Sequence, residues 1–272
     1  MILGLRAHDF GRHEPGELAG RISSAGFETA QLALLKAISG IDSFADVNGS
    51  VLERVRRAFE DNNVQIGVLG CYMEIGLTDK AARLAEVDKF LIGLEHGKAL
   101  GAGLVGTETS WCVPEDESMR EPAYQGLKDS VLRMTERAEK LGVDIGVEPV
   151  AVHTMNSAET TRRLLDEVGS KRLRVIFDPI NLMLTQEDID NQVTLMESFL
   201  AMLGDDVVAV HVKDVVIEAG EKLWRNLGKG SVKFDPVFKY FREKGRSIPA
   251  LREEVSPDSY EVDLEEMRRL NA

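Results

Sequence analysis

Short apolar runs rich in Val, Ile and Leu alternate along the chain with longer stretches in which apolar residues recur every three or four positions. The short runs are typical of buried strands, and the longer pattern is typical of helices packed on one face. The first pattern predicts strands at residues 2–6, 29–34, 65–69, 104–108, 144–148, 174–178, 207–211 and 248–253. The second predicts helices at residues 15–25, 50–62, 80–100, 122–141, 158–168, 189–203, 236–244 and 264–270.

The predicted strands and helices follow one another in alternation from end to end. Repeated strand–helix units build parallel sheets, and about eight of them make an α/β fold of the (β/α)₈ TIM barrel type. No Pro- or Ser-rich linker interrupts the series, so the sequence predicts a single TIM-barrel domain over residues 1–272. A doubly wound open sheet is the alternative fold, and it would place a ligand at a switch point of its strand order.

The composition, 43% hydrophobic and 29% charged, is ordinary for a globular protein with a large core. A net charge of −13 argues against a nucleic-acid partner, because binding to phosphates depends on clustered Lys and Arg. The N-terminus lacks the apolar segment of a signal peptide and no later apolar run is long enough to cross a membrane, which predicts a cytoplasmic protein. Cys71 and Cys112 are far apart, so we expect buried thiols and no disulfide.

Three consecutive predicted strands end in residues that can bind a metal: Glu148, Asp178 and His211. The C-terminal ends of barrel strands meet at one rim, so these side chains should converge there, together with Glu253 or Glu254 from the last strand. An acidic residue at such a place is often only a helix N-cap or a solvated loop group. Several of them after apolar strand interiors lose hydration energy unless a cation or another partner compensates them. Carboxylates with one imidazole suit a single divalent ion, with Mn²⁺ as the first expectation and Mg²⁺, Co²⁺ or Zn²⁺ as alternatives.

Five segments of the second half of the chain carry a resemblance: Glu148-Pro149-Val150, Asp178-Pro179-Ile180-Asn181, His211-Val212-Lys213-Asp214, the loop from Leu227 to Phe234, and Glu253. In this order they resemble the motifs of the sugar phosphate isomerase/epimerase family, which shares the xylose isomerase-like barrel. The resemblance runs over most of the chain from the fifth predicted strand onward. It implies that Glu148, Asp178, His211 and Glu253 bind one divalent metal ion. It also implies that Glu148 and Glu253 flank the substrate as catalytic acid and base.

The sequence departs from the family pattern at its last motif, where Arg252 precedes Glu253 and Glu254 follows it. Side chains alternate along a strand, so only one of the two glutamates can face the barrel axis. The distance from Pro249 fits the family pattern for Glu253, and Glu254 stays the alternative.

Further polar residues near the strand ends are candidates for substrate binding: His8, Glu108, Trp111, His153, Asn181 and Lys213. Trp111 is equally well explained as a loop aromatic packed on the edge of the barrel. Asn181 occupies a position that resembles the family's substrate-facing residue. Lys213 lies two residues beyond His211 and should point to the same side of a continuing strand. There it would hold a phosphate or carboxylate, unless it is a solvated loop lysine.

The sequence therefore predicts a divalent-metal-dependent isomerase or epimerase of a small sugar, keto sugar or sugar phosphate. In this hypothesis the metal binds neighbouring oxygens of the substrate, and the glutamates transfer a proton through an enediolate. An inosose-type dehydratase, an endonuclease IV-like metallohydrolase and a non-catalytic sugar sensor are the alternatives. The five histidines and the negative charge argue against the nuclease. The expected partner is a small sugar, without nucleic acid or membrane, and assembly into a homo-oligomer is left open.

Overall fold

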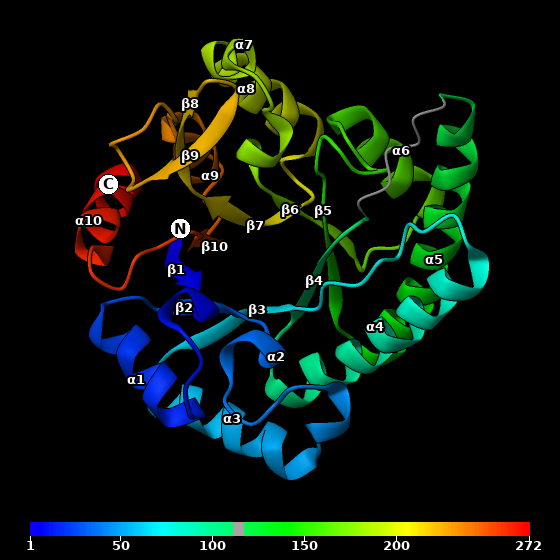
Figure 1. Cartoon of the computed structure of the whole chain (residues 1–272), viewed down its shortest axis with the longest axis horizontal. Helices are drawn as coiled ribbons and strands as arrows, with labels where there is room; N and C mark the ends of the chain where they lie inside the picture. Colours follow the sequence, from blue (N-terminus) through cyan, green and yellow to red (C-terminus); the bar gives the residue numbers. More distant parts are fainter. Residues whose placement is uncertain (111–116) are drawn as a thin grey trace.

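Eight parallel strands close into a barrel in the computed structural model, which describes residues 1–110 and 117–272. Around the ring, β1 pairs with β10 and the order continues through β7, β6, β5, β4, β3 and β2 back to β1 (Figure 1). The strands are β1 (Ile2–Arg6), β2 (Thr29–Leu32), β3 (Gln65–Gly70), β4 (Leu104–Glu108), β5 (Asp144–Glu148), β6 (Leu173–Phe177), β7 (Val207–Val212) and β10 (Pro249–Arg252). The closed ring confirms the predicted (β/α)₈ TIM barrel and excludes the open doubly wound sheet.

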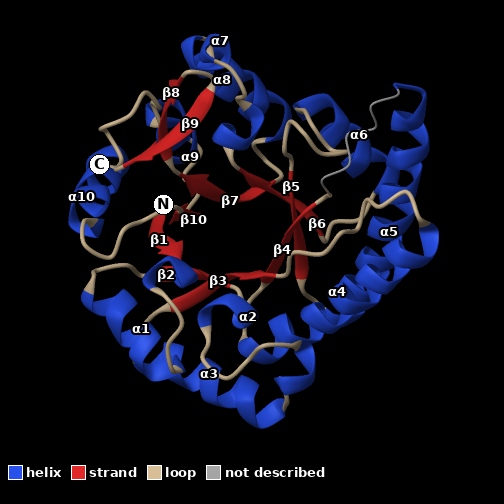
Figure 2. Ribbon diagram, viewed as in Figure 1, coloured by secondary structure: helices blue, strands red, loops and turns tan. Residues whose placement is uncertain are grey.

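The helices form an outer layer around the strands, as Figure 2 shows. The long ones are α1 (Pro15–Ser24), α3 (Gly49–Asp61), α4 (Lys80–Leu100), α5 (Arg120–Leu141), α6 (Ala158–Val168), α8 (Gln192–Leu203), α9 (Asp235–Glu243) and α10 (Tyr260–Asn271). Shorter turns lie in the loops: α2 (Leu34–Ala37), α7 (Gln186–Asp190), η1 (Ala7–Phe10), η2 (Phe44–Asp46), η3 (Glu117–Met119) and η4 (Pro179–Leu182). Within the described residues, no helix is both long enough and apolar enough to cross a membrane.

The inside of the barrel is filled by apolar side chains below the rim. A separate buried cluster there consists of Val68, Leu104, Ile176, Ala209 and Leu251. A Cβ atom on Gly146 would lie 2.8 Å from Ile176 Cγ1, so the glycine leaves the space that this isoleucine occupies. The packed interior makes the barrel a solid support for the residues at its rim.

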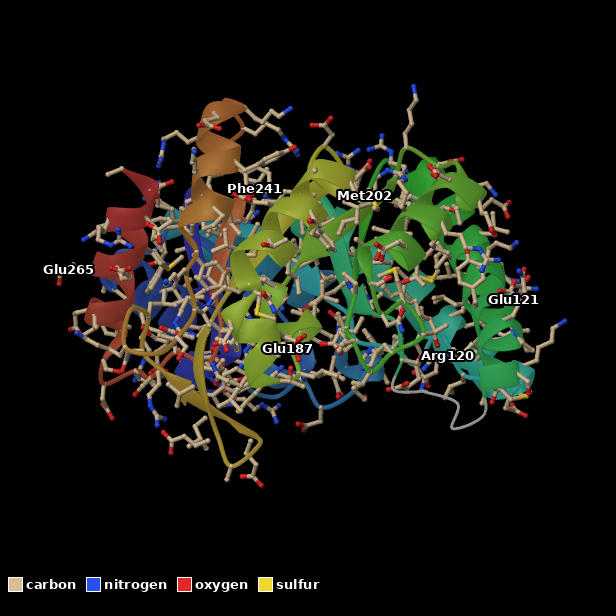
Figure 3. The ribbon with its side chains drawn as sticks, turned by 90° about the horizontal axis from the view of Figure 1, so that it is seen from above. Arg120, Glu121, Glu187, Met202, Phe241 and Glu265 are labelled. Atoms are coloured by element: carbon tan, nitrogen blue, oxygen red, sulfur yellow. The ribbon has the colours of Figure 1, made fainter. Side chains whose placement is uncertain are left out.

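A two-stranded antiparallel hairpin that the sequence analysis did not predict follows β7. We call β8 (Asp214–Glu218) and β9 (Glu221–Arg225) the β8–β9 hairpin. Its turn uses Ala219 and Gly220, both at positive φ, in place of the Asn-Gly pair that marks such turns in a sequence. In the side view of Figure 3 the hairpin extends beyond the barrel at the end opposite to Met202 and Phe241.

A buried ion pair joins the last strand to the last helix. Arg252 Nε lies 3.1 Å from Asp263 Oδ2, and both side chains are almost completely buried. Asp263 also accepts a hydrogen bond from the backbone of Leu227. The pair explains the arginine before Glu253: its side chain points out of the barrel toward α10.

We expect Asp263→Ala to lower the free energy of unfolding by about 3–5 kcal/mol, because it leaves the Arg252 charge buried without its partner. Urea unfolding followed by circular dichroism measures the change. Glu265→Ala is the matched control, since Glu265 lies on the same helix and is exposed. Equal stability of the two variants would contradict a structural role for this ion pair.

Candidate metal centre

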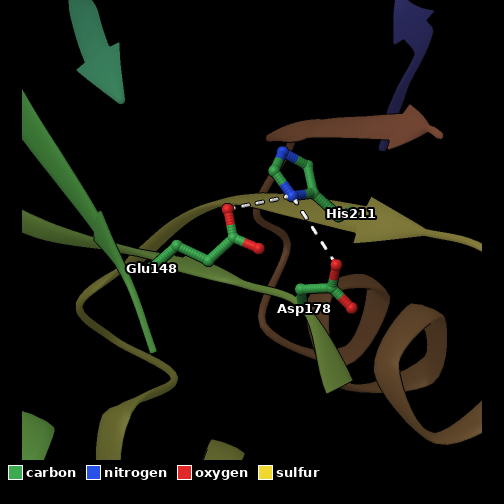
Figure 4. A group of neighbouring side chains, drawn as sticks. All are labelled: Glu148, Asp178 and His211. Atoms are coloured by element: carbon green, nitrogen blue, oxygen red, sulfur yellow. Dashed lines mark ion pairs between the residues drawn. The ribbon is translucent and has the colours of Figure 1, made fainter. Parts of the chain in front are cut away.

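Three side chains from neighbouring strands meet at the rim of the barrel (Figure 4). Glu148 ends β5, Asp178 follows β6 directly, and His211 lies near the end of β7. His211 Nδ1 is 3.2 Å from Glu148 Oε2 and 3.8 Å from Asp178 Oδ2. One ligand atom from each residue lies within 4.8 Å of the others, and all three residues are buried. The parallel strands thus bring together residues that are far apart in the sequence.

Glu253, and not Glu254, points toward this group. Glu253 Oε1 lies 3.6 Å from His211 Nδ1, and the residue is buried. Leu251 lies inside the barrel and Arg252 points outward, so alternation returns Glu253 to the inside. Glu254 has a φ of 59°, leaves the strand direction and pairs instead with Arg6.

The other ring nitrogen of His211 is held from the opposite side of the barrel. His211 Nε2 lies 2.6 Å from Gln31 Oε1 on β2, and both residues are buried. The amide nitrogen of Gln31 donates in turn to the hydroxyl of Tyr72. With this arrangement Gln31 Oε1 accepts a hydrogen bond from the N–H at Nε2, and the lone pair of Nδ1 faces the carboxylates. Gln31 was not among the residues predicted from the sequence, where its one signal was a long polar side chain within an apolar strand.

The geometry of His211 tests whether these residues fit a cation. Its Nδ1 atom is buried, faces Glu148, Asp178 and Glu253, and makes no hydrogen bond within the described part of the chain. A lone pair among carboxylates is repelled unless a proton or a metal ion lies between them. Three carboxylates and one imidazole are a donor set that divalent ions such as Mn²⁺, Mg²⁺, Co²⁺ and Zn²⁺ accept. The residues present therefore fit a divalent metal ion.

The carboxylates also set the protonation of the histidine when no metal is bound. Burial by itself would lower the pKa of His211, but the charges of Glu253 and Glu148 outweigh burial and raise the pKa to about 9. Burial raises the pKa of Glu148, although His211 works against it. For Glu253 the opposite holds: burial would raise the pKa, but His211, Lys213 and Arg6 lower it well below its usual value.

Lys213 lies within the cluster and is not a free loop cation. Its Nζ atom is 2.6 Å from Asp178 Oδ2 and 3.0 Å from Glu253 Oε2, and the residue is buried. Burial would lower the pKa of Lys213, but Asp178 and Glu253 raise it above its usual value. This excludes the solvated loop lysine that the sequence left open, and the charge of Lys213 is already balanced by two carboxylates.

Two further predicted residues lie together near the cluster. Glu108 ends β4, with 40% of its side chain exposed, and its Oε2 atom is 3.8 Å from His153 Nε2. Burial and the charge of Glu148 raise the pKa of Glu108 to about 7. Burial lowers the pKa of His153 to about 4, so this imidazole is neutral at pH 7.

Asn181 and His8 complete the described part of the predicted set. Asn181, in η4, donates from Nδ2 to Glu148 Oε1 at 2.6 Å. His8, in η1, is half-buried, and burial followed by the charge of Arg6 lowers its pKa to about 4. Trp111 lies outside the described residues. Asn181 and Lys213 are thus in contact with the cluster.

We expect Gln31→Leu to weaken metal binding by about 10- to 100-fold, because the imidazole loses the acceptor that orients it. Gln31→Glu keeps an acceptor for the Nε2 proton and should bind metal more tightly than Gln31→Leu. Competition with a chromogenic chelator measures the affinities. Wild-type affinity in Gln31→Leu would contradict the orienting role of this residue.

Known proteins match the chain in sequence pattern and in fold. The pattern that defines the xylose isomerase-like TIM barrel family matches residues 20–270. No curated protein matches the chain in sequence. The apo form of 3-keto-D-glucoside 4-epimerase from E. coli superposes with a TM-score of 0.78 and 18% identity, covering 99% of each chain.

Other solved structures agree with this fold. A D-tagatose 3-epimerase-like protein has a TM-score of 0.77 and 14% identity, over 99% of this chain and 97% of that protein. The IOLI protein with a bound zinc atom has a TM-score of 0.70 and 17% identity, over 100% of this chain and 95% of that protein. Identities this low show the fold alone, but the family pattern covers most of the sequence as well. The chain belongs to the xylose isomerase-like TIM barrel family.

Proposed function

We propose that this protein is a divalent-metal-dependent epimerase or isomerase of a small keto sugar. The observation that carries the proposal is the buried group of Glu148, Asp178 and His211, with Glu253 beside the same imidazole nitrogen. Similar structures include D-psicose 3-epimerase in the presence of D-fructose and a barrel protein from Mycobacterium smegmatis in complex with magnesium. These neighbours support a sugar substrate and a divalent ion.

The two glutamates reach the cluster from different parts of the ring. In the ring order, β6 and β7 separate β5, which carries Glu148, from β10, which precedes Glu253. A divalent ion held by Glu148, Asp178, His211 and Glu253 would polarise the carbonyl and hydroxyl oxygens of a bound sugar and make the adjoining C–H more acidic. One glutamate then removes this proton and the other returns a proton. Return to the opposite face of the same carbon inverts it, and return to the neighbouring carbon isomerises the sugar.

The remaining polar residues are proposed to bind the substrate. Asn181 donates a hydrogen bond to Glu148, and its amide group can also donate a hydrogen bond to a sugar hydroxyl. Glu108 and His153 form a pair that offers a carboxylate and a neutral imidazole for hydrogen bonds to hydroxyls. Lys213, whose Nζ atom contacts Glu253, is proposed to keep this glutamate charged and to donate a further N–H to a substrate oxygen. His8 and Trp111 are proposed as further contacts on the strength of their places after β1 and β4 in the sequence.

A substrate screen tests the proposal directly. Protein reconstituted with Mn²⁺, Co²⁺, Mg²⁺ or Zn²⁺ is incubated with ketohexoses and inososes, and the products are identified by NMR. We expect a metal-dependent epimer or isomer of a keto sugar. Loss of water from an inosose would show that the protein is a dehydratase that uses the same residues, and would contradict the proposed isomerase. Metal binding without conversion of any sugar would contradict an enzymatic function of this kind.

A further inference from the structure

Trp224 on the β8–β9 hairpin is an exposed aromatic residue close to the metal-ligand cluster. Its side chain is on β9, opposite Val215, and the residue is 42% exposed. The Lys213 Nζ atom lies 5.6 Å from the centre of the indole ring. The same ammonium group contacts Asp178 and Glu253. The ammonium group of Lys213 therefore links the indole ring to the carboxylates of Asp178 and Glu253. A large part of Trp224 is exposed to solvent.

The backbone around Trp224 is held in place by contacts to the barrel. Arg252 Nη2 donates to the carbonyl of Arg225 at 3.0 Å, next to Trp224 in the chain. Lys222 Nζ donates to the carbonyl of Ile180 at 2.7 Å, which ties the hairpin to η4. Ser231 N donates to the carbonyl of Val215 at 2.8 Å. An aromatic side chain on a backbone that is held in place beside a polar cluster is typical of a ligand contact.

Three cations on or beside the β8–β9 hairpin already have partners: Lys213, Lys222 and Arg225. Lys213 is balanced by Asp178 and Glu253, and Arg225 Nη2 lies 3.4 Å from Glu218 Oε1. Lys222 donates to a backbone carbonyl. A phosphate group on the substrate would have to compete with these carboxylates for Lys213 and Arg225, and Lys222 already uses one of its N–H groups for the carbonyl of Ile180. The surroundings of Trp224 thus favour an uncharged ligand with an apolar face.

We propose that Trp224 determines specificity by stacking against the C–H face of an uncharged keto sugar, whose oxygen atoms point toward the cluster. Sugar rings present C–H groups of slightly positive charge, and the face of an indole is negative, so the two surfaces attract. This inference rests on the proposed function for its substrate, and it narrows the substrate class from small keto sugars to those without a charged group such as phosphate.

The test compares Trp224→Ala and Trp224→Phe with the wild type in metal-reconstituted protein. The probes are D-fructose, D-tagatose and D-fructose 6-phosphate, and the measurements are their Kd by saturation-transfer NMR together with KM and kcat for any sugar that reacts. We expect Trp224→Ala to raise Kd and KM for the uncharged ketohexose by about tenfold while kcat changes by less than about threefold. Trp224→Phe should recover most of the loss. D-Fructose 6-phosphate should bind no more tightly than D-fructose.

Met202→Ala is the matched control, because Met202 is 41% exposed and lies at the other end of the molecule in Figure 3. It should leave Kd, KM and kcat unchanged. If ketohexoses react but Trp224→Ala keeps the wild-type Kd and KM, the stacking role is wrong and the proposed function stands. If ketohexoses bind through Trp224 but none reacts, the inference stands and the proposed reaction is wrong. Tighter binding of D-fructose 6-phosphate overturns the uncharged substrate class, and wild-type protein that binds none of the probes overturns the inference.

Discussion

His211→Ala is expected to reduce the metal content of reconstituted protein from about one divalent ion per chain to less than about a tenth. The reason is geometric, because Nδ1 of His211 lies within 3.8 Å of a carboxylate oxygen of each of Glu148, Asp178 and Glu253. The fold should persist, since the apolar layer around Ile176 fills the barrel below the rim. Elemental analysis measures the metal, and circular dichroism measures the fold.

Asp178→Asn gives the same test with less disturbance of the backbone. Asp178 Oδ1 accepts hydrogen bonds from the backbone of Ile180 and Asn181, and an asparagine oxygen can keep both. The variant therefore removes one negative charge and leaves the start of η4 in place. His96→Ala is the control, since His96 is a buried histidine of α4 outside the cluster. Wild-type metal content in both His211→Ala and Asp178→Asn would show that the cluster is not the metal site.

The second large effect is expected in proton transfer. Turnover of a keto sugar in heavy water should place deuterium on the carbon next to the carbonyl, because a proton held by a carboxylate can exchange with solvent before it is returned. Glu148→Gln and Glu253→Gln should each lower this labelling by a factor of about 10² to 10⁴. Substrate binding should weaken much less, since an amide keeps the shape of the carboxylate. Mass spectrometry of the recovered sugar measures the label.

Glu254→Gln is the matched control for this experiment. Glu254 adjoins Glu253 in the chain, but its carboxylate pairs with Arg6 and a third of its side chain is exposed. Its loss should leave the labelling within about twofold of the wild type. Normal labelling in Glu253→Gln with loss in Glu254→Gln would transfer the role to Glu254. An isomerised product without deuterium would indicate a hydride shift and rule out proton transfer by either residue.

Local patterns in the sequence were sufficient to predict the barrel and three of the residues that meet at its rim. Apolar runs predicted β1, β4 and β5 with the bounds that the structure has. In a parallel barrel the C-terminal ends of all strands lie at the same rim, so Glu148, Asp178 and His211 could be expected to converge. The prediction works because the period of apolar residues is a property of the chain itself, and because all strands run in one direction.

The tertiary structure alone decided which residues surround these three. Gln31 and His211 are 180 positions apart and meet only because the ring of strands closes. The choice of Glu253 over Glu254 depended on the outward turn of Arg252 toward α10, and that turn depends on a partner in another element. The β8–β9 hairpin was not predicted because its strands are partly exposed and show only a weak alternation of apolar and polar residues, and because its turn is Ala-Gly. Local periodicity specifies the elements, whereas side-chain partners across the barrel follow from closure and strand register, which no short segment of sequence contains.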